Sequence, residues 1–335
     1  MEPEIKDRYN DQILQTAMQR FGIAEGQIKL LDGFESFMYE FQRDGGEYIL
    51  RIGHSRRRTV DLIKGEVDWI NALAAGGAGV AKAIRSASGA LVEVIDDSKD
   101  GQFLVTAFTK ALGRPVWEWE AGWTPALYER YGELLGRIHA LSRRYTPADP
   151  AWKRLEWDAP SNLEVERWLS PDQHIVHQKF HQVKAAIDAL PRGPESYGLV
   201  HQDAHPGNFF VTEEGQFTLF DFDDCVYSWY IYDVAMVVFY MIVLKDDPLA
   251  LTREFMPAFW RGYRREFALD PRWLAEIPLF MKLREIDLYA VIHRSYPDVN
   301  AIEDRWPRTY MQGRKARIEN DVPLVEYDFR QAAEG

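Results

Sequence analysis

The feature of this sequence that most restricts its fold is a β-rich segment, residues 198–221, inside a part of the chain whose other patterns are helical. Residues 199–200 predict a short buried strand, and the Pro-Gly pair at 206–207 predicts the turn of the loop that follows. Residues 208–220 then predict a β-hairpin. The loop is thus anchored by a strand before it and a hairpin after it. This arrangement fixes the positions of the polar side chains that the loop carries.

Three polar residues of this segment, Asp203, Asn208 and Asp221, are expected to converge, because the loop precedes the first hairpin strand and Asp221 ends the second. Phosphoryl transfer needs a carboxylate that orients the attacking hydroxyl and accepts its proton, together with oxygen ligands for Mg²⁺. Asp203 suits the first task, whereas Asn208 and Asp221 suit the second. His201, Asp203 and Asn208 also have the spacing of a kinase catalytic loop, which is His-x-Asp followed, after four residues, by Asn.

The remainder of the chain divides into a β-rich beginning and a long helical part. Strands are expected at 28–31, 37–43, 47–52, 80–84, 90–95 and 103–107, and helices at 7–21 and 59–75. Further helices are expected at 127–141, 174–190, 229–244, 249–267, 272–294 and 300–319. The sequence therefore predicts an α+β fold with a small β-rich N-lobe, residues 1–108, and a larger, mainly helical C-lobe, residues 109–335. The C-lobe would contain the catalytic and metal-binding hairpin at 198–224.

Length, charge and cysteine content exclude several classes of protein. A chain of 335 residues favours two lobes over one core, and a net charge of −12 argues against nucleic-acid binding. The basic run 56–58 is short and is expected to lie in a solvated loop or at the start of a helix. With one cysteine, Cys225, no disulfide framework is expected. The apolar stretch 229–244 is too short for a membrane span, and the acidic N-terminus is no signal peptide, so we expect a cytoplasmic protein without a membrane partner.

The segment 198–224 resembles the aminoglycoside phosphotransferase and choline kinase superfamily, relatives of the protein kinases. The resemblance rests on three separated motifs, which are His201-x-Asp-x-His-Pro-Gly-Asn208, then Asp221-Phe-Asp-Asp224, then Tyr232-Asp233-Val-Ala. It implies a two-lobed protein-kinase-like fold, ATP or GTP as the phosphate donor, Mg²⁺, and a small-molecule hydroxyl as the acceptor. It also implies that His201 and Asp233 support the catalytic loop. Asp223 is either a further metal ligand or a solvated carboxylate.

The same resemblance implies a nucleotide site in the N-lobe. Its residues belong to a nucleotide-positioning loop, a cation and its acidic partner, and an interlobe hinge whose backbone would bind adenine: Gly33 and Ser36, Arg51 and Glu66, Ala107 and Thr109. Protein kinases carry Lys at the third-strand position, where this chain has Arg51. Arginine keeps the charge and can bind phosphate with two hydrogen bonds, but it changes reach and geometry.

Alternatives to a small-molecule kinase are a non-catalytic nucleotide-binding pseudokinase, a protein Ser/Thr kinase, and a zinc hydrolase that uses His201, Asp203 and His205. The pseudokinase predicts the loss of Asp203, Asn208 or Asp221, and none of them is lost. The hydrolase leaves Asn208 and Asp221 without a role. The sequence does not predict the oligomeric state.

The acceptor is expected to be an amine-bearing alcohol, such as an amino sugar or amino alcohol. Residues 201–250 hold nine Asp and Glu but one Lys, and an anionic cleft attracts cations. Tyr227 and Trp229 are expected to offer aromatic faces to an ammonium group, and Glu285 and Asp287 to add carboxylates.

Overall fold

The computed structural model describes residues 3–31, 33 and 35–334, and the chain divides into two compact units. The N-terminal unit contains Met1–Gly113, Tyr145–Arg154 and Thr218–Asp223. The C-terminal unit contains Arg114–Arg144, Leu155–Phe217 and Asp224–Gly335. Two short segments from the second half of the chain thus complete the N-terminal unit.

The N-terminal unit is built on an antiparallel sheet. Its strands are β1 (Ile28–Leu30), β2 (Phe37–Arg43), β3 (Gly46–His54), β4 (Ala83–Ile84), β5 (Glu93–Asp96) and β6 (Gln102–Thr109). Their order is β1-β2-β3-β6-β4, and β5 also pairs directly with β6. The expected hairpin between β2 and β3 is present, with Asp44 and Gly45 in the left-handed region that a tight turn requires.

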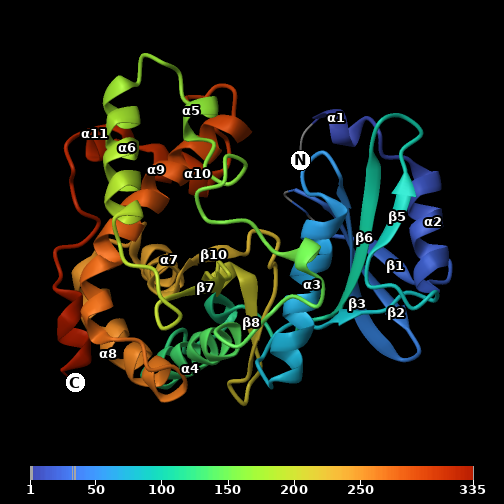
Figure 1. Ribbon diagram of the computed structural model, residues 1–335, viewed down its shortest axis with the longest axis horizontal. Coiled ribbons are helices and arrows are strands. Elements are labelled where there is room, and N and C mark those ends of the chain that lie inside the picture. The colour runs from blue at the N-terminus through green and yellow to red at the C-terminus, as the bar shows by residue number, and fades with distance from the viewer. Residues whose placement is uncertain (1–2, 32, 34, 335) are drawn as a thin grey trace. The chain divides into compact units, whose positions relative to one another are not determined.

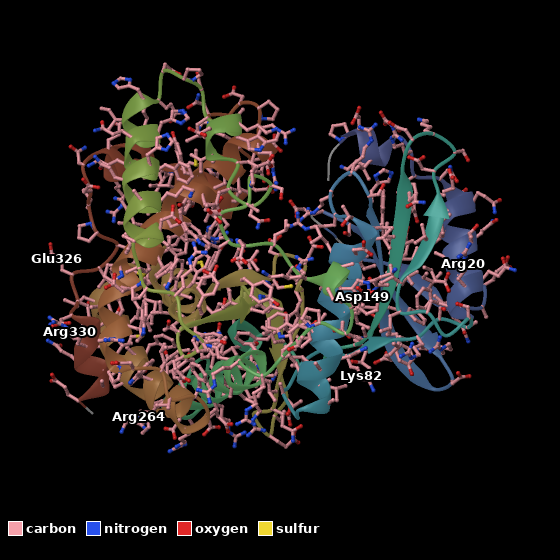
Figure 2. The ribbon with its side chains drawn as sticks, in the orientation of Figure 1. Arg20, Lys82, Asp149, Arg264, Glu326 and Arg330 are labelled. Atoms are coloured by element: carbon pink, nitrogen blue, oxygen red, sulfur yellow. The ribbon has the colours of Figure 1, made fainter. Side chains whose placement is uncertain are left out.

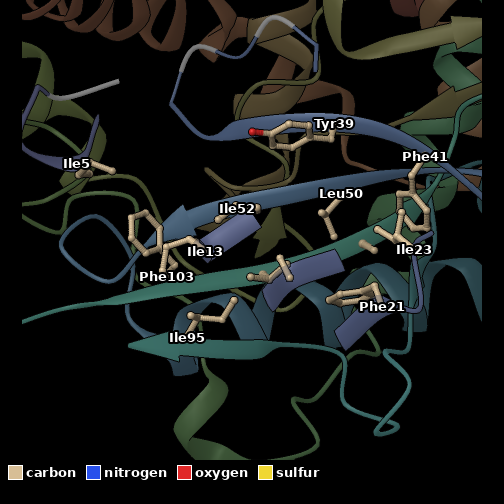
Figure 3. Close-up of a cluster of buried hydrophobic side chains, with 13 residues drawn as sticks. Ile5, Ile13, Phe21, Ile23, Tyr39, Phe41, Leu50, Ile52, Ile95 and Phe103 are labelled. Atoms are coloured by element: carbon tan, nitrogen blue, oxygen red, sulfur yellow. The ribbon is translucent and has the colours of Figure 1, made fainter. Parts of the chain in front are cut away.

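The two faces of this sheet carry different side chains, because successive residues of a strand point to opposite sides. Leu50 and Ile52 of β3 join a buried apolar cluster with Ile13 and Phe21 of helix α2 (Asp11–Phe21), which Figure 3 shows. Arg51 lies between them and therefore points to the other face, where helix α3 (Val60–Ala75) packs (Figure 1). The strand alternation alone decides which helix Arg51 meets.

The first expected helix, 7–21, is interrupted in the structure. Helix α1 (Pro3–Lys6) is separate, and α2 begins only after Asn10. The Asn10 side chain accepts a hydrogen bond from the Ile13 N–H, which is the usual way in which Asn starts a helix.

The C-terminal unit is mainly helical, as the sequence predicts (Figure 1). Its helices are α4 (Pro125–Ser142), α5 (Val165–Trp168), α6 (His174–Asp188), α7 (Tyr230–Ile242), α8 (Pro248–Glu266), α9 (Ile277–Ser295), α10 (Arg305–Met311) and α11 (Arg314–Glu319). The expected helix at 300–319 is two helices, because Gly313 adopts a left-handed conformation between them. The expected helix at 272–294 starts as a 3₁₀ turn over Pro271–Glu276.

The β-rich segment contains one strand that the sequence analysis missed. Strands β7 (Tyr197–Val200) and β10 (Val226–Trp229) pair with each other, and β8 (Phe209–Val211) pairs with β9 (Phe217–Leu219) as a hairpin. The residues of β10 merge into the apolar run of α7, so periodicity did not separate strand from helix. Trp229 was expected to begin that helix and instead ends the strand.

Helices α4 and α8 approach each other closely, because glycines lie at their contact. A Cβ atom at Gly132 would lie 1.9 Å from the Phe259 carbonyl oxygen, and one at Gly262 would lie 1.9 Å from the Glu129 carbonyl oxygen. Charged side chains such as Arg264 and Arg330 project from the outside of this unit (Figure 2).

Among the helices of the described residues, none combines the length and the apolar character that crossing a bilayer demands.

Candidate active site

Asp233 fixes the backbone of the expected catalytic loop. This fully buried residue on α7 accepts hydrogen bonds from the N–H groups of His201 (2.8 Å) and Gln202 (2.6 Å). Gln202 has a positive φ of 72°, a conformation that needs such support in a residue other than glycine. Asp233 Oδ2 also lies 3.1 Å from His139 Nε2, which places this histidine of α4 in a packed, structural position. The arrangement agrees with the brace expected of Asp233.

Asp203 follows this fixed backbone and has partners on both carboxylate oxygens. Arg284 of α9 donates to Oδ1 at 2.8 Å, and the side-chain amide of Asn208 donates to Oδ2 at 3.2 Å. His205 Nε2 lies 3.3 Å from the same Oδ2, while its Nδ1 accepts from the Gly207 N–H. This tautomer makes Nε2 the donor to Asp203. The loop therefore holds Asp203 in one orientation.

The charge of Asp203 is stabilised by its neighbours. Burial alone would raise its pKa, but the contacts with His205 and Arg284 hold the pKa well below its usual value. The side chain is 20% exposed, so a ligand can still reach it. Asp203 is thus an oriented, permanently ionised carboxylate, which suits it to accept a hydrogen bond from a hydroxyl.

His201 acts on the loop from inside. It is fully buried, and its Nδ1 accepts a hydrogen bond from the Asp203 N–H at 3.2 Å. This contact agrees with the supporting role expected from the sequence.

Arg284 is a site residue that the sequence analysis did not find. It donates to Asp203 and to Asp287 (3.1 Å), and its Nη2 lies 2.5 Å from the Tyr240 hydroxyl of α7. Its guanidinium also stands 5.4 Å from the centre of the Tyr240 ring. Arg284 and Asp287 are spaced i, i+3 on α9, which is a recognisable helical ion pair. The contact between Arg284 and Asp203 joins residues that are 81 positions apart in sequence, so no local sequence pattern predicts it.

Asp287 was expected near the acceptor, and the structure brings it to Asp203 through their shared Arg284. Its side chain is 6% exposed. Burial raises the pKa of Asp287 to about 6; the charge of Asp224 adds to this effect, and Arg284 opposes it. Asp203 and Asp287 therefore place two carboxylates on one arginine, Arg284, and Asp224 is close enough to Asp287 to raise its pKa.

Of three other residues expected to contact the acceptor, Trp229 and Glu285 are engaged elsewhere and these two expectations are corrected, whereas Tyr227 is half-buried and its contact stays a prediction. Trp229 is fully buried, and its indole N–H donates to the Pro191 carbonyl. Glu285 is 1% exposed, and its carboxylate is bound by Arg314 at 2.7 Å. Tyr227 lies in β10, and burial raises the pKa of its hydroxyl. The side chains of Trp229 on strand β10 and of Glu285 on helix α9 are buried in the core.

The N-terminal unit contains the expected pair of Arg51 and Glu66. The two side chains form a double hydrogen bond of 2.8 and 2.6 Å, and both are buried. Burial alone would lower the pKa of Arg51, but the charge of Glu66 raises it, so that Arg51 is always cationic. Arg51 Nε also donates to Thr106 of β6. The cation is therefore rigidly oriented on the α3 side of the sheet.

Asp223 is not a solvated carboxylate, because arginines surround it, and its role as a metal ligand stays a prediction. Arg57 Nη2 lies 2.9 Å and Arg58 Nε lies 3.5 Å from its Oδ2, and Arg51 lies 3.9 Å from its Oδ1. Arg154 donates to its backbone carbonyl at 2.5 Å. Burial would raise the pKa of Asp223, but these cations hold it well below its usual value. The expected solvated loop or helix start at residues 56–58 lies just before α3, and the side chains of Arg57 and Arg58 are mostly buried against Asp223 and not solvated.

Gly33 and Ser36 lie where the chain turns into β2. A Cβ atom on Gly33 would lie 2.3 Å from the Ser36 carbonyl oxygen, so this tight turn requires glycine. Ser36 lines a small cavity together with Arg51 and Gly53. Their assignment to a nucleotide-positioning loop stays a prediction.

The residues of the expected hinge, Ala107 and Thr109, lie in strand β6. Strand β6 continues to Thr109, whose N–H donates to the Lys82 carbonyl at 2.9 Å. Ala107 is fully buried and opposes both Leu50 of β3 and Ile84 of β4. The N–H of Thr109 is therefore engaged in the sheet, and the assignment of these two residues to an adenine-binding hinge stays a prediction.

The expected metal ligands fall into both units. Asn208 uses its amide nitrogen for Asp203, which leaves the amide oxygen as its ligand atom. Asp221 belongs to the N-terminal unit, where its charge helps to raise the pKa of Arg51. It has a positive φ of 64°, an uncommon conformation that is often found at functional sites. An amide oxygen and a carboxylate are a suitable set for Mg²⁺, and their convergence stays a prediction.

Comparisons with known proteins agree with this geometry. The model of a family described as the phosphotransferase enzyme family matches residues 27–277. The amicoumacin kinase of Bacillus subtilis (strain 168) is 37% identical over 325 residues, which cover 96% of this chain and 95% of that protein. A solved structure of an amicoumacin kinase in complex with AMP-PNP, Ca²⁺ and Ami has a TM-score of 0.92 at 35% identity, and the match covers 99% of each chain. A microcompartment-associated aminopropanol kinase has a TM-score of 0.72 at 23% identity, covering 93% of this chain and 97% of that one.

Proposed function

The chain belongs to the phosphotransferase enzyme family, and from this premise we propose that it phosphorylates a hydroxyl of an amine-bearing small molecule, with Asp203 as the catalytic carboxylate. It is an ATP-dependent small-molecule kinase with a kinase-like α+β fold, and it uses a divalent metal. The family and fold that the sequence predicted are therefore confirmed. The alternatives of a pseudokinase, a protein kinase and a zinc hydrolase are set aside.

The observation that carries the assignment of Asp203 is its orientation by Arg284, Asn208 and His205. Phosphoryl transfer has a loose transition state in most descriptions, so positioning contributes more than strong basicity. An ionised carboxylate that cannot rotate fixes the direction of the acceptor hydroxyl. Its low pKa makes Asp203 a weak base. A weak base is sufficient if the acceptor hydroxyl loses its proton late in the transfer of the phosphoryl group.

The residues proposed for the metal are Asn208 and Asp221. A bound Mg²⁺ would neutralise charge on the phosphates of the donor. Asn208 contributes in a second way, because its amide nitrogen fixes Asp203 at 3.2 Å. We propose that this shared residue couples the position of the carboxylate to that of the metal ligand. Arg51, held by Glu66, would bind the phosphates.

The charge around Asp203 supports a cationic acceptor. Asp203 and Asp287 share one cation, Arg284, and the charge of Asp224 acts on Asp287. The aromatic residue Trp306 is 41% exposed and lies beside Tyr240, which contacts Arg284. The face of an exposed indole suits an ammonium group. Amicoumacin, on which the 37% identical relative acts, is the first acceptor to test. We place the reaction in the cytoplasm, where ATP is available.

The test is an ATP-consumption screen with amicoumacin, amino alcohols, amino sugars and aminoglycosides, and with neutral and anionic alcohols as controls. Phosphorylated products are identified by mass spectrometry. We expect the highest kcat/KM with an amine-bearing alcohol. N-acetylation of that acceptor keeps its hydroxyl but removes its charge, and it should lower kcat/KM. A best acceptor that is neutral or anionic would contradict the proposal.

A further inference from the structure

Two arginines that follow β3, Arg57 and Arg58, have no role in the site described so far. Together with Arg51, Ser36 and Asp223 they line one cavity in the N-terminal unit. Its volume is about 10 Å³, about the room of one water molecule. The side chains of Arg57 and Arg58 are 18% and 11% exposed. Three guanidinium groups thus gather around a nearly filled cavity.

The group that fills the centre of this cluster is a carboxylate. Asp223 Oδ2 accepts a hydrogen bond from Arg57 at 2.9 Å, and the same oxygen lies 3.5 Å from Arg58. Arg57 also pairs with Glu35. Guanidinium groups bind phosphate and carboxylate oxygens in the same geometry. The positions of these carboxylate oxygens therefore mark where phosphate oxygens would be bound.

The loop that carries the arginines is held in place by contacts that do not involve Asp223. His54 Nε2 lies 3.1 Å from the buried Asp97, and its Nδ1 accepts from the Arg56 N–H. The Ser55 N–H donates to the Gln102 carbonyl. Arg56 points away and pairs with Glu4 and Asp100. Of the three consecutive arginines, Arg57 and Arg58 therefore point toward Asp223, and Arg56 points away from it.

We propose that Arg57 and Arg58 are ligands of the donor's triphosphate, in addition to Arg51, and that Asp223 occupies their phosphate position until the nucleotide binds. Binding then exchanges one anion for another, and Asp223 leaves the arginines. A chain of phosphates meets more of these cations than a single phosphate does. The cluster therefore selects nucleoside triphosphates over monophosphates. This inference deepens the proposed function and rests on its use of ATP.

The first experiment compares three neighbouring arginines by isothermal titration calorimetry, without acceptor, on the full chain. In Arg57→Gln and Arg58→Gln, the dissociation constant of ATP should rise about 10-fold to 100-fold, as expected for lost hydrogen bonds between charged groups. The dissociation constant of AMP should change less than about threefold, because AMP lacks the outer phosphates. Arg56→Gln is the matched control, since an exposed pair contributes little, and its ATP affinity should stay within about twofold of wild type.

The second experiment tests the stand-in role of Asp223 without metal. Inorganic tripolyphosphate in the presence of EDTA should bind Asp223→Asn about 10-fold more tightly than wild type, because the competing carboxylate charge is gone. Affinity that is unchanged or lower would overturn the exchange. A loss of affinity confined to Mg²⁺-containing solutions would show that Asp223 is only a metal ligand and would also overturn it.

Folding is checked for each variant by thermal unfolding, and Arg57→Lys keeps the positive charge if Arg57→Gln unfolds. Arg57→Lys should retain part of the preference for ATP over AMP. Equal losses for AMP and ATP, or an unchanged ATP affinity in both Arg57 variants, would overturn the assignment. These measurements use no acceptor, so they can fail while the proposed acceptor chemistry stands. They can also succeed if the acceptor proves to be neutral.

Discussion

Asp203 depends on groups from two parts of the chain, because its loop supplies His205 and Asn208 while α9 supplies Arg284. Asp203→Asn keeps the size and most hydrogen bonds of this side chain but removes its charge. We expect turnover to fall about 10²-fold to 10⁴-fold, as is typical when a proton acceptor is removed. The dissociation constant of ATP should stay nearly unchanged, since Asp203 is assigned to the acceptor. Turnover above about a tenth of wild type would contradict the assignment.

Asp287 should make stability depend on pH in the opposite sense to Asp203. Its folded-state pKa of about 6 is above the value near 3.9 expected in an unfolded chain. The folded protein therefore binds this proton more strongly, and the stabilisation is complete below about pH 4 and is lost as the pH rises through 6. Asp203 has a lowered pKa, so its contribution is present above its unfolded value and is lost only in acid.

The variant Asp287→Asn cannot ionise and isolates this effect. The free energy of unfolding of the variant minus that of wild type should be higher at pH 8 than at pH 4.5, by about 1–3 kcal/mol for a shift of roughly two pKa units. The variant is thus the relatively more stable protein at pH 8. Urea unfolding at the two pH values measures the difference. If the variant and the wild type differ equally at both pH values, Asp287 is ionised in the folded protein at both.

The residues that sequence could identify were those with fixed local spacing. His201, Asp203 and Asn208 lie within eight positions, and Asp233 lies at a fixed place in the next helix. Arg284 and Arg154 act through contacts 81 and 69 positions away, respectively, and no periodicity encodes such pairs. Arg57 and Arg58 were misinterpreted for the same reason, because their partner Asp223 is distant in sequence.

At the scale of elements, the contact between α4 and α8 depends on glycine. The hypothetical Cβ of Gly132 would overlap the backbone of Phe259, and that of Gly262 would overlap the backbone of Glu129. Backbone atoms cannot rotate away as a flexible side chain can, so a methyl group at either position forces the helices apart. Gly136 faces Tyr263 in the same way, with its Cβ 2.4 Å from the carbonyl oxygen.

Gly132→Ala should therefore destabilise the protein although alanine is the better helix former. We expect the free energy of unfolding to fall by about 1–3 kcal/mol, the usual cost of overpacking. Gly193→Ala is the matched control, because a Cβ atom there would meet no atom within 4 Å. Urea unfolding of both variants tests this. Equal stability of the two variants would mean that the helices adjust their separation without cost.

Element types were more predictable than element ends. The strands at β2 and β6 and the long helices α3, α4 and α8 have regular periodicity, and they lie close to the expected ranges. Ends that depend on a single residue were missed: Asn10 starts α2, and Gly313 separates α10 from α11. The strand β10 was missed because an apolar run has no period that distinguishes strand from helix.

At the scale of the whole molecule, the chain does not divide at one point. Residues 145–154 and 218–223 belong to the N-terminal unit although they are separated from it by long helical segments. One of these segments carries Asp221 and Asp223, and the other carries Arg154. Composition and hydropathy describe only neighbours in sequence, so the return of these segments could not be predicted from them. Their return brings Asp223 to the arginines of the N-terminal unit.

The net charge of −12 leads to a last prediction, which concerns association with the acceptor. A cation approaching Asp203, Asp224 and Asp287 is attracted over a distance that salt shortens, since the Debye length falls from about 30 Å at 0.01 M to about 10 Å at 0.1 M. With ATP saturating, kcat/KM for an amine-bearing acceptor should fall about 3-fold to 10-fold over this range, within the span seen for electrostatic steering. The N-acetylated acceptor is uncharged and should show almost no salt dependence. Because both acceptors share one hydroxyl and one donor, a parallel decline would place the salt effect in ATP binding or in the chemical step. A decline confined to the cationic form would locate it in the attraction between the amine and these carboxylates.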